Sequence, residues 1–220
     1  MYKTVIYNMD SINAIKNILT KQEERVLKLS AGLKKDPLYW FCKSYTIVTK
    51  QLLQYTCENK FSNPQFIAGV VVAFDDIFEV NLYAYQHQTQ MPSLQWQKAF
   101  HDLYQMPDYE YSMYRFIKSW LALRSCLKVH IEDDLPGCLA SSIKNNTSDI
   151  DSMEADFFCM HRIFYNTAKQ IEREMMQEYQ VLLKHFPTKI KNGLLHWYIK
   201  QLVIKNRKRS WKEAWCLVAA

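Results

Sequence analysis

The sequence predicts an all-α protein: a single domain over residues 1–220, folded as one bundle of about seven or eight helices around an aromatic-rich core. Apolar residues recur at helical spacing over long stretches of the chain. Only four Gly and six Pro occur among the 220 residues, too few for the tight turns of an all-β protein. Phe, Tyr and Trp make up 14% of the chain, so large rings should fill the interior.

Start signals divide the first half of the chain into four helices. Asp10 can cap the first of them with its side chain. The next two starts combine a capping residue with a first-turn proline, at Asp36-Pro37 and at Asn63-Pro64. The predicted helices cover residues 10–34, 38–58 and 64–87, with a short helix between Pro92 and Pro107.

Two local signals set helix boundaries in the second half. Leu135-Pro136 should stop a long helix, because the residue before a proline disfavours the helical conformation. Ser210 and Glu213 have the spacing of a capping box, which predicts a break near Arg209. The predicted elements are a helix over 109–134, a short helix after it, a polar stretch at 145–148, a helix over 149–186 and a last helical segment over 189–220.

Cysteine spacing and hydropathy bear on the compartment. The six cysteines lie far apart with no Cys-x-x-Cys pair, and we expect them to be reduced and buried. The N-terminus lacks the apolar core of a signal peptide, and no apolar run approaches the roughly 20 residues that cross a bilayer. The sequence therefore predicts a cytoplasmic protein without a transmembrane segment.

The net charge of +6 is concentrated near the C-terminal end, between Lys184 and Lys212. Such a run forms either a solvated helix face or a surface that binds a phosphate, an acidic lipid or nucleic acid. Nucleic acid is the least favoured partner, because no helix-turn-helix, zinc-finger or aromatic RNA-binding signature accompanies the charge. Walker, dinucleotide and Gly-x-Ser-x-Gly motifs are also missing from the sequence.

Three acids, Asp75, Asp76 and Glu79, follow the apolar run 67–73 on the third predicted helix. An unpaired carboxylate in such surroundings costs several kcal/mol, so a cation or local hydration should face it. Asp75 and Glu79 are four residues apart and share a helix face, and carboxylates at this spacing suit Mg²⁺. The alternative is an ion pair with Lys or Arg from a neighbouring helix.

His130 and Asp134 form a second candidate site, also at a spacing of four. They can ligate one metal ion from a single helix. Acids at a helix C-terminus oppose the macrodipole, which suggests a compensating partner. The alternative is that Lys128 pairs with Glu132 and that His130 is a core histidine with a satisfied hydrogen bond.

The string Phe74-Asp-Asp-Ile-Phe-Glu79 resembles the aspartate-rich D-D-x-x-D/E motif of class I terpene synthases. The resemblance implies that Asp75 and Glu79 coordinate Mg²⁺, which holds a prenyl diphosphate in an aromatic-lined helical cavity until pyrophosphate leaves. Residues 206–213 are similar to the second motif of that family, N-D-x-x-S-x-x-x-E, with Arg207 in place of the second acid and Glu213 one residue early.

A wider part of the chain is similar to a bacterial all-helical family of unknown function. The resemblance raises His130 and Asp134 as site candidates and implies no reaction. The matching segments are Tyr45-x-x-Val48-Thr49, Phe78-x-x-Asn81-Leu82-Tyr83, Val129-His130-Ile131-x-x-Asp134-Leu135 and Ala214-Trp215.

Three functions remain open from the sequence. The first is a Mg²⁺-dependent, terpene synthase-like lyase acting on an apolar substrate such as a prenyl diphosphate, with metal held by Asp75, Asp76 and Glu79. The second is a zinc- or iron-dependent hydrolase centred on His130 and Asp134, in which the metal activates water and Asp75 or Asp76 completes the metal shell. Both enzyme hypotheses expect the two acid clusters to face one cavity. The third is a non-enzymatic helical protein whose aromatic pocket binds an apolar ligand or a partner helix. In the first, the diphosphate would contact Arg162, Arg207 or Arg209, and the rings of Phe74, Phe78, Tyr83 and Trp120 would stabilise cationic intermediates.

Overall fold

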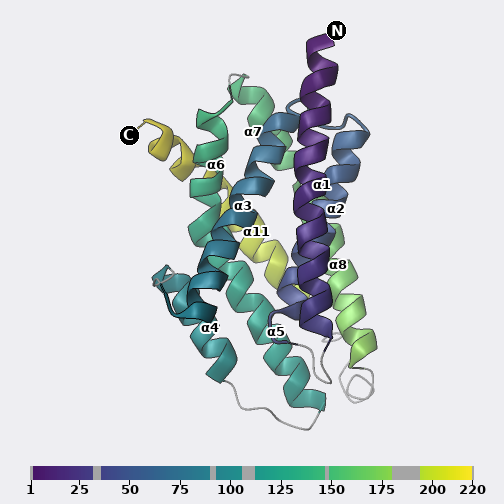
Figure 1. Cartoon of the computed structure of the whole chain (residues 1–220), viewed down its shortest axis with the longest axis vertical. Helices are drawn as coiled ribbons and strands as arrows, with labels where there is room; N and C mark the ends of the chain where they lie inside the picture. The colour runs from purple at the N-terminus through teal and green to yellow at the C-terminus, as the bar shows by residue number, and fades with distance from the viewer. Residues whose placement is uncertain are drawn as a thin grey trace.

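A computed structural model describes residues 2–31, 36–89, 93–105, 112–146, 149–179 and 194–219. The described part is a helical bundle, which confirms the predicted all-α class (Figure 1). None of its helices is long and apolar enough to cross a membrane. The elements are α1 (Tyr2–Ser30), α2 (Tyr39–Cys57), α3 (Pro64–His87), α4 (Leu94–Gln105), α5 (Ser112–Val129), the π-helix η1 (His130–Asp134), α6 (Leu135–Lys144), α7 (Ile150–Cys159), α8 (His161–Glu178) and α11 (Leu194–Ala219).

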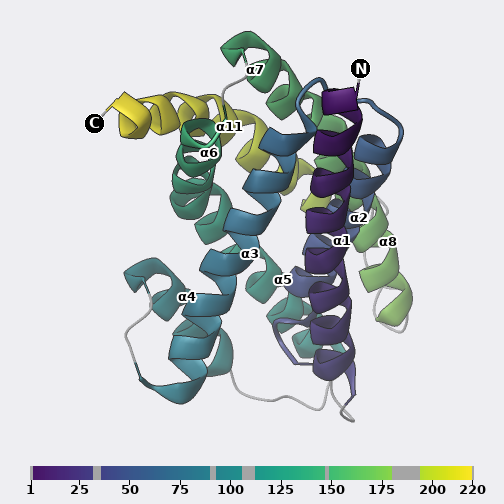
Figure 2. The same ribbon diagram turned by 45° about the horizontal axis from the view of Figure 1, so that its top comes forward.

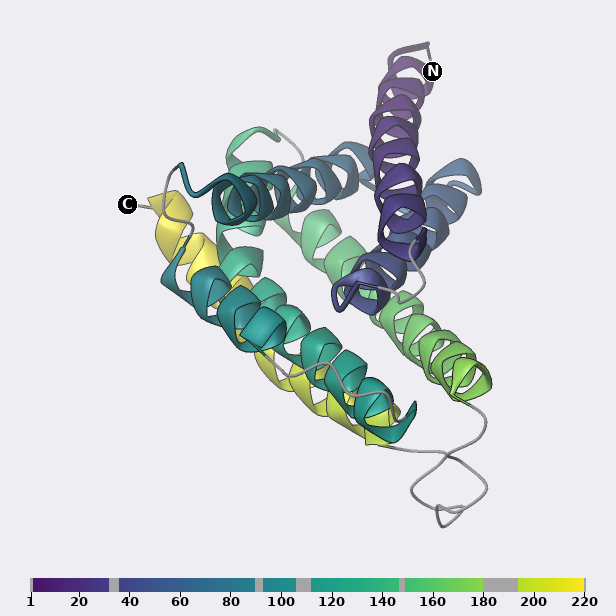
Figure 3. The ribbon, with the colours of Figure 1, turned by 60° about the horizontal axis from the view of Figure 1, so that its bottom comes forward.

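The helices pack so that α3 lies between α1 and α6 (Figure 2). Helix α2 contacts α1 on one side and α8 on another, and α11 packs against both α6 and α8. The N-terminal end of α1 and the C-terminal end of α11 lie at separate corners of the molecule (Figure 3).

Large rings fill two buried clusters, and Leu127 packs against both. Phe66, Phe157 and Trp211 belong to one cluster. The other contains Trp96 and Phe100. The aromatic-rich core that the composition predicts is thus confirmed.

Local capping chemistry explains two helix starts that the sequence predicts. The Asn63 side chain accepts a hydrogen bond from the Phe66 backbone N–H at 3.2 Å, and Pro64 opens α3. The Asp149 carboxylate accepts from the Ser152 backbone N–H at 3.2 Å at the start of α7. Both starts are confirmed, because each depends on residues within three positions of the cap.

Other predicted boundaries were wrong. Helix α1 begins at Tyr2 rather than at Asp10, and the helix predicted from residue 149 is divided at Met160 into α7 and α8. Its predicted end near 186 and the loop around Lys34 lie outside the described residues. Helix α11 continues past Arg209, because the Ser210 hydroxyl donates to the Asn206 carbonyl instead of capping a new helix.

Pro136 does not stop the helix that precedes it. Helix α5 continues through η1 into α6, and the Leu135 N–H donates to the His130 carbonyl, five residues earlier. A regular α-helix would set the proline ring against the carbonyl four residues before it. The wider π-turn inserts one extra residue at this point, so the chain continues helically. The π-turn contains both His130 and Asp134.

The prediction for the cysteines is correct for their reduced state and wrong for the burial of three of them. All six are free thiols, and Cys42, Cys126 and Cys138 are buried. The other three, Cys57, Cys159 and Cys216, are exposed, because each lies on the solvent side of its helix.

Candidate functional site

The buried acid on α3 is matched by a cation from α1. Asp75 is 1% exposed, and its Oδ1 lies 3.4 Å from Arg25 Nη1 and accepts from Gln22 Nε2 at 3.2 Å. Arg25 also pairs with Glu79 and lies over the Phe78 ring at 5.1 Å. Burial lowers the pKa of Arg25, but the Asp75 and Glu79 carboxylates raise it, and the net shift is upward. This geometry corresponds to the ion-pair alternative for the two acids.

Asp76 points away from this ion pair. It is exposed and lines a separate groove between α1, α3 and α6, together with Asp10 and Asn145. Within the described residues, no group of three His, Cys, Asp or Glu side chains is arranged to hold a metal ion. The three acids of the aspartate-rich motif therefore do not converge, and Mg²⁺ binding by them stays a prediction that this arrangement does not favour.

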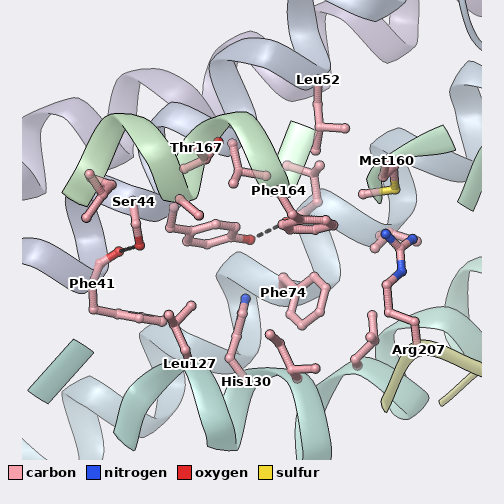
Figure 4. Close-up of a pocket in the computed structure, with 18 of the residues that line it drawn as sticks. Phe41, Ser44, Leu52, Phe74, Leu127, His130, Met160, Phe164, Thr167 and Arg207 are labelled. Carbon is pink, nitrogen blue, oxygen red and sulfur yellow. Dashed lines mark hydrogen bonds between the residues drawn. The ribbon is translucent and has the colours of Figure 1, made fainter. Parts of the chain in front are cut away.

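An internal cavity lies beside α3, enclosed by residues of α2, α3, α5, η1, α6, α7, α8 and α11 (Figure 4). The cavity volume is about 80 Å³. Phe74, His130 and Arg207 line this cavity, whereas Asp75 does not. The two predicted sites therefore do not share it: only the site around His130 reaches the cavity.

His130 is 7% exposed and is held by Asp134. Its Nδ1 lies 3.3 Å from Asp134 Oδ2, and Trp96 Nε1 donates to the same oxygen at 3.0 Å. The His130 ring centre lies 4.0 Å from that of Phe74 and 5.1 Å from that of Tyr45. Figure 4 shows a ring nitrogen of His130 pointing into the cavity.

Glu132, beside His130, has a different partner from the Lys128 that the alternative hypothesis predicts. Glu132 Oε1 accepts a hydrogen bond from Asn206 Nδ2 at 3.0 Å, which ties η1 to α11. Asp133 is largely exposed. Its pKa is raised, first by partial burial of the carboxyl and second by the negative charges of the neighbouring Asp134 and Glu132. Among the described residues, the hydrogen-bond partners of Glu132 and Asp134 are therefore an amide, an indole and the His130 imidazole.

Arg207 is the unusual charge of the cavity. It is 1% exposed, and Nη2 donates to the Phe157 carbonyl. The guanidinium carbon lies 3.7 Å from the centre of the Phe157 ring and 5.2 Å from that of Phe164. Nε and Nη1 have no hydrogen-bond partner, and no acid pairs with Arg207 in the part of the chain that the structure describes. Burial lowers its pKa to about 9.

The other predicted substrate contacts lie elsewhere. Arg162 is exposed, and Arg209 pairs with Glu213 at 3.4 Å on the surface of α11. Tyr83 is exposed and stacks on His87, and Phe78 is buried in the core away from the cavity lining. Trp120 is half-buried, with Arg124 over its ring at 5.6 Å.

The sequence interpretation missed Arg25 and Trp96, which hold Asp75 and Asp134. A signal for Arg25 was present. Gln22 and Arg25 continue the three- and four-residue spacing of Ile15 and Ile18, so they lie on the buried stripe of α1. Polar residues on such a stripe need a buried partner. No comparable local signal connects Trp96 with Asp134, 38 positions later.

The chain belongs to the family of unknown function DUF5995, whose family model matches residues 15–220. This agrees with the resemblance to a helical family of unknown function, and nothing in the comparisons points to class I terpene synthases. No curated protein and no solved structure matches the chain.

Proposed function

For this member of the DUF5995 family, we propose that the internal cavity binds a small apolar molecule with a single carboxylate head group, which Arg207 receives. The observation that carries the proposal is the Arg207 guanidinium, which is almost fully buried against the cavity without an acidic partner among the described residues. An unpaired buried charge costs several kcal/mol, because the apolar surroundings do not replace its hydration.

A carboxylate supplies what this guanidinium lacks. Its oxygens accept charge-assisted hydrogen bonds, and the N–H groups on Nε and Nη1 have no acceptor in the described residues. The rings of Phe157 and Phe164 hold the guanidinium plane in position. Binding an anion here would therefore remove the cost of the isolated charge without requiring a large rearrangement.

The rest of the cavity favours an apolar ligand body. Most of the lining side chains are aliphatic or aromatic. Three of the lining hydroxyls already have protein partners: Ser44 donates to the Phe41 carbonyl at 2.7 Å, Tyr45 donates to the Val71 carbonyl at 3.2 Å, and Thr167 accepts from Gln51 at 3.3 Å. Apart from Arg207 and His130, the lining therefore has little polar capacity to offer a ligand.

Charge balance favours a carboxylate over a diphosphate. A diphosphate carries several negative charges, and enzymes usually meet them with Mg²⁺ and more than one cation. Among the described residues that line the cavity, Arg207 is the one Lys or Arg, and the acids proposed to hold Mg²⁺ do not line it. A head group with one charge matches the single guanidinium, so the prenyl diphosphate hypothesis has less support from this site.

The test compares octanoate with octanol, which has the same chain length and no charge, by titration calorimetry on the full chain. We expect octanoate to bind at least about tenfold more tightly, because hydrogen bonds to charged groups contribute about 1.5–3 kcal/mol. Arg207→Met should remove this preference, and Arg173→Met, which changes an exposed arginine on α8, should retain it. Equal binding of the two ligands, or an Arg207→Met variant that still prefers octanoate, would overturn the proposal.

A further inference from the structure

His130 gives the cavity a second polar point that the carboxylate does not use. The Asp134 carboxylate only accepts hydrogen bonds, so we assign the proton of the neutral imidazole to Nδ1, which donates to Asp134 Oδ2. Nε2 then carries a lone pair and acts as an acceptor. None of the described residues donates to it.

The orientation of this imidazole is fixed by its surroundings. Trp96 Nε1 donates to the same Asp134 oxygen, which keeps the carboxylate in place behind the ring. Phe41, Tyr45 and Phe74 surround the imidazole with ring centres 4.0–5.6 Å away, and all three also line the cavity. The histidine therefore presents one acceptor atom to an apolar space, at a defined position (Figure 4).

We infer that His130 Nε2 accepts a hydrogen bond from a hydroxyl group of the ligand, so that the ligand class is an apolar hydroxy acid. This inference rests on the proposed function, since it assumes that the carboxylate is held by Arg207. A hydroxyl donates to the lone pair of Nε2, whereas a carbonyl or an ether oxygen has no proton to donate. His130 is then the residue that selects the ligand, and Arg207 anchors it.

The first experiment needs no variant. Titration calorimetry on the full chain compares octanoate with each positional isomer of hydroxyoctanoate, and with the O-methyl ether and the ketone of the best isomer. We expect one isomer to bind about fivefold to tenfold more tightly than octanoate, the size of one hydrogen bond. The ether and the ketone should show no such gain. If every hydroxy isomer binds like octanoate, or if the ether gains as much as the alcohol, the inference is wrong.

The second experiment uses His130→Phe, which keeps an aromatic ring at this position and removes both nitrogens. The ratio of hydroxy acid affinity to octanoate affinity should fall to about one, while His87→Phe, an exposed control on α3, should keep the wild-type ratio. A ratio that survives in His130→Phe would overturn the inference. Should this variant fail to fold, ¹⁵N NMR of wild-type His130 decides: the Nε2 resonance should shift when the hydroxy acid binds and not when octanoate binds.

The outcomes separate the two proposals. If octanoate does not bind, or binds without dependence on Arg207, the proposed function fails and this inference fails with it. If octanoate binds through Arg207 and no hydroxyl preference is found, the carboxylate site stands and only the role of His130 is rejected.

Discussion

Asp75 on α3 and Arg207 on α11 are both 1% exposed, and the difference between them is the partner. Asp75 is met by Arg25 and Gln22 from α1, whereas Arg207 is met by two rings and one carbonyl. A buried charge that the protein itself neutralises contributes to the fold. A buried charge that it leaves unmatched, at the wall of a cavity, is the better indicator of a ligand.

The largest expected effect separates the two regions by stability. Arg25→Met leaves Asp75 buried without its cation, and removing one partner of a buried ion pair costs about 3–5 kcal/mol of the free energy of unfolding. Arg207→Met removes an unmatched charge and keeps an apolar side chain of similar length. We expect this variant to lie within about 1 kcal/mol of wild type or above it, because the loss of one hydrogen bond and two ring contacts is offset by removal of a buried, unmatched charge.

Urea denaturation of the two variants and of wild type, without ligand, measures this difference. An Arg207→Met variant that loses as much stability as Arg25→Met would break the comparison, because Arg207 would then be a structural charge. An Arg25→Met variant that unfolds at the wild-type urea concentration would break it from the other side, since Asp75 would not need its cation.

A second difference is expected in the pH dependence of ligand binding. Octanoate affinity should be constant between about pH 6 and pH 8, where the ligand is ionised and Arg207 is protonated. It should fall at lower pH, as the ligand carboxylate takes up a proton, and at higher pH, since burial lowers the pKa of Arg207 to about 9. The pKa of Arg25 is raised instead, so its ion pair should persist over the same range. Titration calorimetry at pH values below, within and above this range measures the affinity. An affinity that does not change above pH 9 would contradict the assignment of Arg207 as the anchor.

At high pH, the same loss of a proton from Arg207 that weakens octanoate binding should increase the stability of the fold. Its folded-state pKa, about 9, lies below the ordinary value of 12.5. Between these values the unfolded chain binds a proton that the folded chain has lost, so the contribution of Arg207 to stability rises with pH in this window. The free energy of unfolding, measured between pH 8 and pH 10, should therefore contain this rise in wild type and lack it in Arg207→Met.

The smallest expected effect concerns magnesium. Because Arg25 already neutralises Asp75 and Glu79, and Asp76 faces another groove, millimolar Mg²⁺ should leave the melting temperature almost unchanged. Differential scanning fluorimetry with and without Mg²⁺ measures this shift. A rise of several degrees that disappears in Asp75→Asn would contradict the ion-pair account and return the aspartate-rich motif to the centre of the function.

Local chemistry decided which parts of this fold could be predicted from the sequence. The helix starts at Asn63 and Asp149 follow from caps that reach three residues along the chain. The continuation through Pro136 could not be predicted this way, because buried packing of η1 and α6 outweighs the local preference of a residue before proline.

The candidate site was harder to predict from the sequence than the helices, since the role of each charged residue depends on partners far away along the chain. The chain shows where charges lie in apolar surroundings, but the 50-residue separation between Arg25 and Asp75 conceals that a cation of the protein already faces this acid. The sequence predicts both His130 and Arg207 as site residues, His130 through its spacing from Asp134 and a resemblance, and Arg207 as a contact for a diphosphate. Their common cavity, and the lack of an acid beside Arg207 in the described residues, became visible only in three dimensions.

A crystal structure of the protein with octanoate tests the central claim most directly. The account predicts a carboxylate within about 3 Å of Nε or Nη1 of Arg207, with the alkyl chain extending along Phe74 toward His130. Octanoate bound outside the cavity, or inside it with its carboxylate away from Arg207, would contradict the account.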